Sequence, residues 1–367
     1  MPKFVAIFLN FIMLFCSFAS ISYGAGISAR HFALLEAETG EIICEGNGNS
    51  RAPMASTTKI MTAIVAIENG RLDKTVTIPS EATGIEGSSI YLQEGEELTL
   101  EELLYALMLE SANDAAVAIA IEIGGGVPEF VEIMNRKAEE LKLDSTHFTN
   151  PHGLDNAEHY TTAADLARLA AYAMNNPIFE KIASTQKKVI PLSDDGSRVL
   201  INHNKLLRLY KGAIGVKTGF TKRSGRCLVS CAEQNGVRLI CVTLNAPGDW
   251  NDHRQLLDYG FGQYERITLA EAGAYTISLS CINGERSELL CTNPESLSVT
   301  VKKGTRDEIR AVTEYDRLLS APVKKGDRVG QVVFYRGEDI IGECPLYALE
   351  SVKSIKYKKS ILERIFG

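Results

Sequence analysis

Apolar side chains recur every three or four residues through the middle of the chain, and then give way to short runs that alternate apolar and polar positions. The first spacing is typical of helices that bury one face, and strict alternation is typical of half-buried strands. The helical spacing predicts helices over residues 56–68, 98–109, 114–123, 127–141 and 161–174.

Strands are predicted on both sides of this helical stretch. Residues 31–45 form a predicted hairpin that turns at Glu38-Thr39-Gly40, and further strands are expected over 213–220, 227–232 and 237–244. The last two are joined by Asn235-Gly236, and Asn-Gly is the strongest short hairpin signal. Strands, helices and strands in this order predict an α/β (α+β) domain in which helices flank an antiparallel sheet.

The pattern changes after residue 264. Short alternating runs are separated there by Gly, Asp and Asn turns, so residues 265–350 are predicted to form a small all-β domain. This segment has no His and no evident catalytic cluster, so we expect it to serve in spacing or interaction. The predicted strands include 275–279, 297–301, 329–335 and 339–341.

The two ends differ from the rest of the chain. Residues 1–24 combine a basic start at Lys3, an apolar run and a zone of small residues, which is typical of a cleaved secretory signal. An uncleaved membrane anchor is the alternative. Residues 351–367 hold five Lys or Arg against one Glu, and their apolar positions fall on one half of a helix. Such a basic amphipathic helix suits an anionic membrane surface, and a helix packed on its own protein is the alternative.

Composition limits the classes of protein that fit. Hydrophobic residues make up 45% and charged residues 23%, as in packed globular proteins, and the formal net charge of −7 argues against a nucleic-acid partner. One of the eight cysteines lies in the leader, and the other seven contain no CxxC pair, so we expect no metal site. Cys281 and Cys291 are the pair most compatible with a disulfide.

The first candidate motif is Ser56-Thr57-Thr58-Lys59, at a predicted helix start. Residues three apart on a helix face the same way, so the Lys59 amine can take the proton of the Ser56 hydroxyl. Burial and nearby positive charge would lower the pKa of such a lysine, and the helix N-terminus supplies N–H groups for an oxyanion. Alone, the pattern also fits a helix cap followed by a surface lysine.

Two further motifs follow. Ser111-Ala112-Asn113 lies between two predicted helices, where Ser111 could relay a proton and the Asn113 amide could hold a substrate amide; both could instead cap the next helix. Lys217-Thr218-Gly219 lies on a predicted strand and offers a positive charge, a hydroxyl for a carboxylate and, at Gly219, room for a ligand to approach. An ordinary strand end is the alternative for this third motif.

In this order, SxxK, SxN and KTG form a set known from serine acyltransferases. The chain resembles the low-molecular-mass penicillin-binding proteins, the D-alanyl-D-alanine carboxypeptidases of serine peptidase family S11. The resemblance covers nearly all of the chain after the leader. It includes Asn150-Pro151-His152-Gly153-Leu154, His159-Tyr160-Thr161-Thr162-Ala163 and Ala321-Pro322-Val323-Lys324-Lys325-Gly326-Asp327.

The resemblance implies a β-lactamase/transpeptidase-like catalytic domain over residues 25–264 and a reaction on peptidoglycan stem peptides that end in D-Ala-D-Ala. Ser56 would attack the carbonyl of the penultimate D-alanine, Lys59 would accept its proton, and Ser111 would help to pass that proton to the departing D-alanine. Water would then hydrolyse the acyl-enzyme.

The same resemblance assigns substrate-binding residues and a location. Asn113 would hold the peptide, Lys217 and Thr218 would bind the terminal carboxylate beside Gly219, and the backbone N–H groups of Ser56 and Phe220 would form the oxyanion hole. It also implies acylation by β-lactam antibiotics. The chain is expected to need no cofactor, and to be exported and held at the extracytoplasmic face of the bacterial cell membrane by its C-terminal helix.

Other functions share parts of this pattern. A serine β-lactamase also carries SxxK and KTG, but class A enzymes typically have Ser-Asp-Asn, whereas this chain has Ala112 in the middle and no Glu-x-x-Leu-Asn segment. A non-catalytic wall-binding protein is disfavoured because all three motifs are intact. A zinc peptidase would use His152 and His159, but the chain has no HExxH, so a structural role is favoured for both. Many relatives place an arginine near the terminal carboxylate, and Arg254 is a candidate for it.

Overall fold

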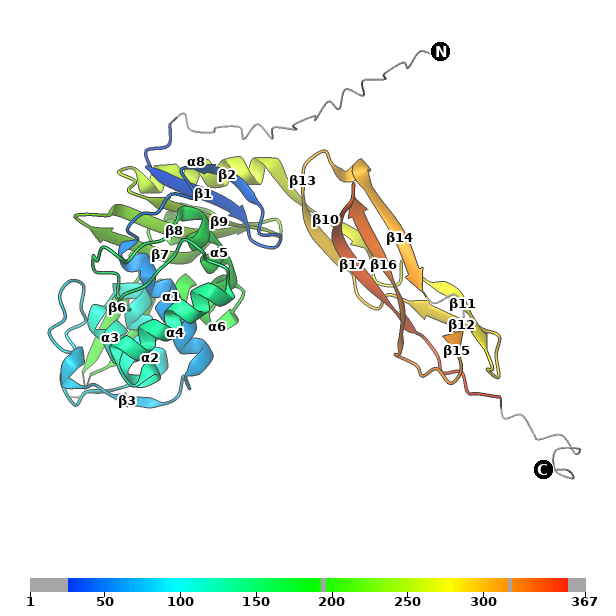
Figure 1. The fold of residues 1–367 in the computed structure, drawn as a ribbon, viewed down its shortest axis with the longest axis horizontal. Coiled ribbons are helices and arrows are strands. Elements are labelled where there is room, and N and C mark those ends of the chain that lie inside the picture. The colour runs from blue at the N-terminus through cyan, green and yellow to red at the C-terminus, as the bar shows by residue number, and fades with distance from the viewer. Residues whose placement is uncertain (1–25, 193–195, 316–318, 356–367) are drawn as a thin grey trace, which may run out of the picture.

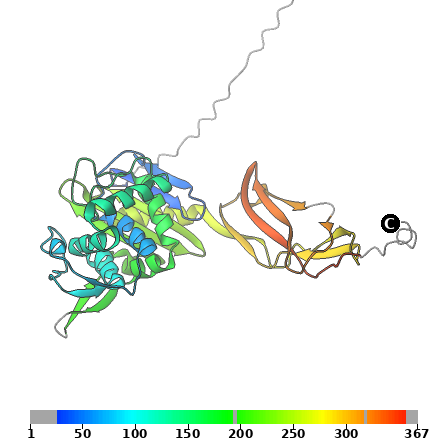
Figure 2. The ribbon, with the colours of Figure 1, turned by 60° about the horizontal axis from the view of Figure 1, so that its bottom comes forward.

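The fold consists of two bodies that meet where helix α8 (Asp249–Gln263) passes into strand β10 (Tyr264–Ala270). A computed structural model of the chain describes residues 26–192, 196–315 and 319–355. The first body holds helices and a sheet, and the second body is made of strands (Figure 1). In Figure 2 the two bodies remain separate, and β10 leads from one into the other. The signal predicted over residues 1–24 lies outside the described residues.

The sheet of the first body has five antiparallel strands in the order β2-β1-β9-β8-β7. Strand β7 lies at the edge of the sheet, where alternate backbone groups have no partner strand. The predicted hairpin at Asn235-Gly236 is confirmed, and both residues have the positive φ that such a turn requires, 51° and 78°. The strands are β1 (His31–Glu36), β2 (Ile42–Gly46), β7 (Ala213–Thr221), β8 (Gly225–Gln234) and β9 (Val237–Leu244).

Helices cover both faces of this sheet. On one face the core is built around α1, in which every residue from Lys59 to Ala66 is buried. Between Lys59 and Glu68 the helix is apolar except for Thr62, because most of its length is surrounded by other elements. Helix α8 covers the other face, where Leu256 and Leu257 pack with Leu34 and Leu239 (Figure 1). The helices of the first face are α1 (Lys59–Asn69), α2 (Leu100–Tyr105), α3 (Asn113–Gly124), α4 (Val127–Glu140), α5 (Ala163–Met174) and α6 (Pro177–Ser184).

Side-chain caps shift the helix starts from their predicted positions. Helix α2 begins at Leu100 because Thr99 and Glu102 form a reciprocal capping box. The helix then widens into a π-helical segment, Ala106–Glu110, which ends at Ser111. Five short elements that the hydrophobic pattern did not predict complete this body. They are β3 (Thr75–Thr77), β4 (Glu97–Thr99), β5 (Lys187–Pro191), β6 (Ser197–Ile201) and α7 (Leu206–Leu209).

The second body confirms the predicted all-β domain. It contains a six-stranded sheet in the order β14-β16-β17-β12-β11-β15 and the separate pair β10-β13. Leu279, Leu289, Val332 and Leu346 belong to a core of its own. Its other strands are β11 (Ile277–Ile282), β12 (Glu288–Thr292), β13 (Leu297–Lys302), β14 (Ile309–Tyr315), β15 (Leu319–Ser320), β16 (Arg328–Arg336) and β17 (Asp339–Ala348).

The disulfide expected between Cys281 and Cys291 is wrong, since both are free thiols buried in this domain. The register of β11 and β12 explains why. Cys291 lies opposite Ile277, four residues before Cys281 on the same strand. At about 3.3 Å per residue this separates the two cysteines by roughly 13 Å. A disulfide needs Cα atoms within about 7 Å.

The C-terminal helix does not begin at Ser351 as predicted. Residues 351–355 are extended, with Val352 paired to Val323 and Ser354 paired to Gly284. Val352 is completely buried, so this stretch is part of the β domain. Residues 356–367, which contain most of the predicted helix, lie outside the described residues. No helix among residues 26–192, 196–315 and 319–355 is long and apolar enough to cross a bilayer.

Candidate active site

Ser56 lies in a tight turn immediately before α1. The turn is a single 3₁₀ segment, Ala55–Thr58, and Ala55 has a φ of 48°, a left-handed conformation that is uncommon for a residue with a side chain. Gly153 packs directly against this turn. A Cβ atom at Gly153 would lie 1.9 Å from the Ala55 carbonyl oxygen, so only glycine fits there. The loop around residue 153 therefore holds the turn that carries Ser56.

Lys59 is completely buried, and its ammonium nitrogen lies at the centre of the site. Nζ is 3.1 Å from Ser56 Oγ, 2.6 Å from Asn113 Oδ1 and 2.7 Å from the carbonyl oxygen of His152. Burial and the nearby positive charge of Lys217 hold the pKa of Lys59 well below its usual value, and Asp114 opposes this in part. A neutral amine beside a hydroxyl is suited to accept its proton.

The second motif turns sharply between the π-helical segment and α3. Ser111 has a φ of 61°, and its hydroxyl has no hydrogen-bond partner in the part of the chain that the structure describes. Asn113 accepts a hydrogen bond from Lys59 and donates one through Nδ2 to the carbonyl oxygen of Glu86, at 2.5 Å. Because Nδ2 carries two hydrogens, one remains available to a ligand.

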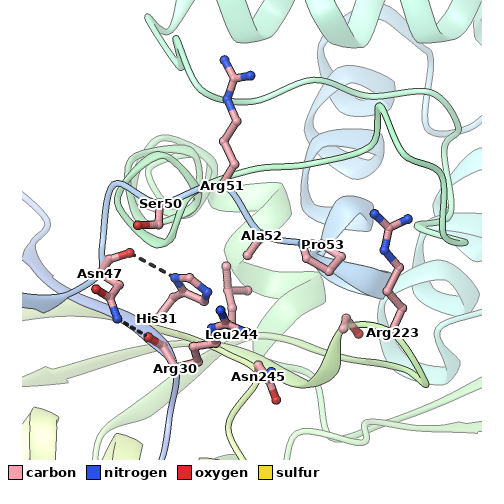
Figure 3. Close-up of a pocket in the computed structure, with 11 residues that line it drawn as sticks. Arg30, His31, Asn47, Ser50, Arg51, Ala52, Pro53, Arg223, Leu244 and Asn245 are labelled. Carbon is pink, nitrogen blue, oxygen red and sulfur yellow. Dashed lines mark hydrogen bonds between the residues drawn. The ribbon is translucent and has the colours of Figure 1, made fainter.

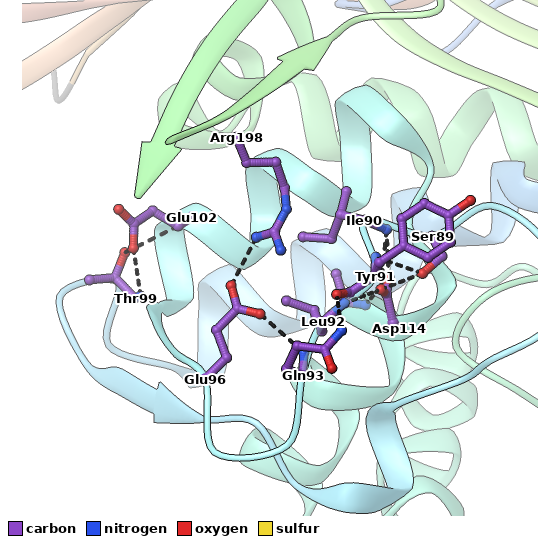
Figure 4. A network of polar contacts seen from close by, with 11 residues as sticks. Ser89, Ile90, Tyr91, Leu92, Gln93, Glu96, Thr99, Glu102, Asp114 and Arg198 are labelled. Atoms are coloured by element: carbon purple, nitrogen blue, oxygen red, sulfur yellow. Dashed lines mark hydrogen bonds and ion pairs between the residues drawn. The ribbon is translucent and has the colours of Figure 1, made fainter. Parts of the chain in front are cut away.

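Asp114 fixes the loop that lies beside Asn113 (Figure 4). Its buried carboxylate accepts hydrogen bonds from the Ser89 hydroxyl and from the backbone N–H groups of Ile90 and Leu92. Figure 4 also shows Glu96 of the same loop paired with Arg198, at 2.9 Å. The loop is thus held at two points, and its Ser88 carbonyl accepts the backbone N–H of Asn113.

The third motif lies on the edge strand β7. Lys217 is buried, and this burial lowers the pKa of its ammonium group to about 7, while the charge of Glu110 acts in the opposite direction. Gly219 allows the strand to approach the nucleophile, since a Cβ atom there would be only 3.0 Å from the Ser56 backbone nitrogen. Thr218 is half-buried, and Phe220 leaves 66% of its surface exposed.

A histidine supports the nucleophile turn from behind. The Thr149 N–H donates to His159 Nδ1, which leaves Nε2 to donate to Thr58 Oγ1, 2.8 Å away. The Thr58 hydroxyl in turn donates to the Ala55 carbonyl, at 2.8 Å. Burial lowers the pKa of His159 to about 4, so the ring is neutral, as this chain of hydrogen bonds requires. Burial also lowers the pKa of His152 to about 3.

A family model described as D-alanyl-D-alanine carboxypeptidase matches residues 19–248. The chain belongs to this family. A second model, described as the C-terminal domain of penicillin-binding protein 5, matches residues 264–354. Together the two matches correspond to the two bodies of the fold, which confirms the resemblance inferred from the motifs.

Other members of the carboxypeptidase family are similar over most of their length. D-alanyl-D-alanine carboxypeptidase DacF of Bacillus subtilis is 33% identical over 92% of this chain and 89% of its own length. D-alanyl-D-alanine carboxypeptidase DacC of Escherichia coli is 32% identical over 89% of this chain and 85% of its own length. The crystal structure of penicillin-binding protein 5 from Haemophilus influenzae, 29% identical, covers 89% of this chain and 98% of its own with a TM-score of 0.69.

In this carboxypeptidase family member, direct contacts join Ser56, Lys59 and Asn113, and Gly219 brings β7 against the same turn. Ser111 is part of the turn that presents Asn113, and Lys217 acts on Lys59 through its charge. The described residues contain no group of three His, Cys, Asp or Glu side chains that could hold a metal ion.

Arg254 does not join the site. It is exposed on α8, whereas Arg226 lies opposite Phe220 in the β7-β8 register, beside the KTG strand. Arg226 pairs with Asp249 at 2.9 Å and stands over the Trp250 ring. Arg226 was not predicted, although the strands expected over 213–220 and 227–232 carried a signal, because antiparallel pairing of neighbouring strands brings Arg226 opposite Phe220.

Proposed function

We propose that this chain removes the terminal D-alanine from peptidoglycan pentapeptide stems through an acyl-enzyme on Ser56. The observation that carries the proposal is the buried Lys59 amine, 3.1 Å from the Ser56 hydroxyl and depressed in pKa. A serine needs such a base to become a nucleophile at neutral pH.

The geometry supports a two-step reaction. Neutral Lys59 takes the Ser56 proton as Oγ bonds to the carbonyl carbon of the penultimate D-alanine. The N–H groups of Ser56 and Phe220 stabilise the oxyanion. The C–N bond then breaks, the proton passes to the departing amine with the help of the unpartnered Ser111 hydroxyl, and D-alanine leaves. Water hydrolyses the ester in the second step and restores Ser56.

Substrate binding uses the two motifs that face this centre. Lys217 and Thr218 would hold the terminal carboxylate, since an ammonium group and a hydroxyl together satisfy a carboxylate by charge and hydrogen bonding. The free Nδ2 hydrogen of Asn113 would bind a carbonyl of the stem peptide. The exposed ring of Phe220 at the edge of the strand offers an apolar surface to the peptide beyond the scissile bond.

β-Lactams would acylate the same serine, because they present a strained amide and a carboxylate in a similar arrangement. A β-lactamase must then hydrolyse that ester quickly, and class A enzymes use a carboxylate to activate the water. Among the described residues, no carboxylate hydrogen-bonds to Ser56 or to Lys59, whose partners are Asn113 and the His152 carbonyl. This supports a long-lived penicillin adduct and favours the carboxypeptidase over the β-lactamase.

The decisive experiment is to label the protein with a fluorescent penicillin, map the labelled residue by mass spectrometry and assay D-alanine release from a pentapeptide. We expect a slowly released label on Ser56, with both label and activity lost in Ser56→Ala and retained in the control Ser184→Ala on α6. A label elsewhere, or unchanged D-alanine release by Ser56→Ala, would refute the proposal. Rapid penicillin turnover without a lasting adduct would favour the β-lactamase.

We further propose that the protein acts outside the cytoplasm, at the bacterial membrane surface. Its substrate is a cell-wall polymer, and residues 1–24 have the pattern of an export signal. Residues 356–367 combine apolar positions with four Lys or Arg against one Glu, which suits an anionic lipid surface. Because residues 351–355 are held by the β domain, that domain would lie between the membrane and the catalytic body.

A further inference from the structure

A hollow of about 400 Å³ opens at one end of the five-stranded sheet (Figure 3). Four segments surround it: the start of β1, the loop between β2 and the nucleophile turn, the turn between β7 and β8, and the end of β9. We call it the arginine pocket, because Arg30, Arg51 and Arg223 come to it from the first three of these segments. None of the residues in direct contact with Lys59 lines it.

The charge of this pocket is unbalanced. None of the residues that line it is acidic, although the whole chain carries a formal charge of −7. The guanidinium groups of Arg30 and Arg223 have no hydrogen-bond or ion-pair partner among residues 26–192, 196–315 and 319–355. Arg51 is held at the rim, with its guanidinium carbon 4.4 Å from the centre of the Tyr160 ring. Guanidinium groups that surround a hollow and have no partner are suited to bind a carboxylate or a phosphate.

A buried histidine adds a hydrogen-bond acceptor to the same pocket. His31 is only 8% exposed, and its Nδ1 lies 3.2 Å from the Asn47 carbonyl oxygen, to which it donates (Figure 3). In the neutral ring this leaves Nε2 as an acceptor, and Nε2 has no partner in the described part of the chain. A ligand that satisfies the pocket therefore combines an anionic group with an N–H or O–H donor.

The pocket is close to the scissile bond along the chain. Pro53 lines it and precedes Ser56 by three residues, and Arg223 follows Gly219 by four residues, in the turn after β7. At about 3.3 Å per residue for a fully extended chain, four residues span at most roughly 13 Å. A few residues of extended peptide span that distance, so one ligand can reach both places.

We infer that the arginine pocket binds a carboxylate of the peptidoglycan substrate at a distance from the scissile bond. The inference rests on the proposed function and extends it to a second, remote contact. A peptide carboxylate is accompanied by amide N–H groups, which match the His31 acceptor, whereas a phosphate polymer with no N–H leaves that acceptor unused. The pocket would favour substrates that carry a second carboxylate over short peptides whose terminal carboxylate is their only one.

The test compares two substrates with the full chain and the double variant Arg30→Gln/Arg223→Gln. One substrate is a diacetylated tripeptide ending in D-Ala-D-Ala, whose terminal group is its only carboxylate. The other is a soluble peptidoglycan fragment with pentapeptide stems. For the fragment we expect KM to rise on the order of tenfold in the variant with kcat unchanged, as for lost charge-assisted hydrogen bonds at a partly exposed site. For the tripeptide, neither KM nor kcat should change. Arg136→Gln, which removes an exposed arginine on α4, is the matched control.

Three kinetic outcomes would overturn the inference. They are an unchanged KM for the fragment, an equal loss on both substrates, and an effect that Arg136→Gln reproduces. Co-sedimentation with insoluble peptidoglycan freed of phosphate polymers tests the pocket independently of catalysis, so it remains informative if wild-type protein releases no D-alanine. If the double variant loses binding only to a polyglycerol phosphate, the pocket recognises phosphate and the inference is wrong.

Discussion

The Lys59 ammonium nitrogen lies 3.1 Å from the Ser56 hydroxyl oxygen, in a site where neither group contacts a carboxylate among the described residues. The base is therefore tuned by burial and by the charge of Lys217 rather than by an ion pair. An ion pair would stabilise the ammonium form and remove the base. Because no carboxylate contacts either group, no carboxylate there can activate a water to hydrolyse the acyl-enzyme ester.

Replacing Lys59 should separate catalysis from folding. In Lys59→Met the base is lost but the buried volume is kept, and in Lys59→Arg a charge is kept that cannot be removed at neutral pH. Both variants should acylate with fluorescent penicillin about 10²–10⁴-fold more slowly, the usual worth of general base catalysis. The rate constant of labelling and the melting temperature are the measurements. Near-normal labelling by the folded Met variant would rule out Lys59 as the base.

Removing the Thr58 hydroxyl should loosen the turn that carries Ser56. Thr58→Val keeps the shape but leaves the Ala55 carbonyl and the His159 N–H without their partner, which should cost about 1–3 kcal/mol of unfolding free energy. Acylation should also slow. Thr243→Val is the control, because it removes an equally buried hydrogen bond, to His253 on α8, without touching the turn or the loop that holds it. If both variants slow acylation equally, the effect is one of general stability.

A methyl group at Gly219 should disturb the reaction more than the fold. Its Cβ would lie 3.0 Å from the Ser56 nitrogen and 3.2 Å from the Ala55 Cβ, so Gly219→Ala should push β7 and the nucleophile turn apart. We expect acylation to fall about ten- to hundredfold, because small displacements of reacting groups are costly. Gly262→Ala on α8 meets no atom within 4 Å and should retain full acylation. Equal rates for the two variants would contradict this close approach.

Stability should fall as the pH is lowered from about 6.5 towards 4. Burial lowers the pKa values of His152, His159 and His253 to about 3, 4 and 3, below the unfolded value of 6.5. In this pH range the unfolded chain binds more protons than the folded one, so protonation favours unfolding. Denaturant unfolding at several pH values measures how steeply the free energy of unfolding changes with pH. His253→Gln should flatten it, and parallel curves for the variant and the wild type would show that His253 does not contribute.

Deleting residues 356–367 should release the protein from vesicles that contain anionic lipid, while penicillin labelling continues. The charge and apolar positions of this segment should confer the binding, and neutral vesicles should bind neither form well. The deletion should begin at 356 because Val352 is buried against the β domain. A deletion from 351 should also lower the stability of that domain. Vesicle binding that persists after removal of residues 356–367 would place the membrane contact elsewhere.

Local signals in the sequence predicted much of the fold. The helical spacing located α1, α3, α4 and α5, and Asn235-Gly236 located the β8-β9 turn, because each depends on residues close together in the chain. Helix α8 was not predicted. It buries only part of its surface against one face of the sheet, and Gly260 and Gly262 interrupt the apolar pattern of its sequence. Gly260 lies where a Cβ atom would meet Leu239, a partner 21 positions away that no local pattern reveals.

The errors have the same origin. Cys281 and Cys291 were paired by their nearness in sequence, but the strand register moves them apart. Arg254 is exposed on α8, whereas β-sheet pairing brings Arg226 beside the KTG strand. Val352 lies within the predicted amphipathic helix, yet it is extended and pairs with Val323.

The sequence by itself determined the family, the order of the elements and the nearness of Lys59 to Ser56, because residues three apart at a helix start must meet. Only the tertiary structure decided what surrounds that pair. Asn113, the His152 carbonyl, Lys217 and His159 come from positions 54 to 161 residues away from Ser56 or Lys59, and their burial sets the pKa of Lys59 and holds the Ser56 turn. Desolvation and long-range packing depend on the whole fold, so no local pattern could predict them.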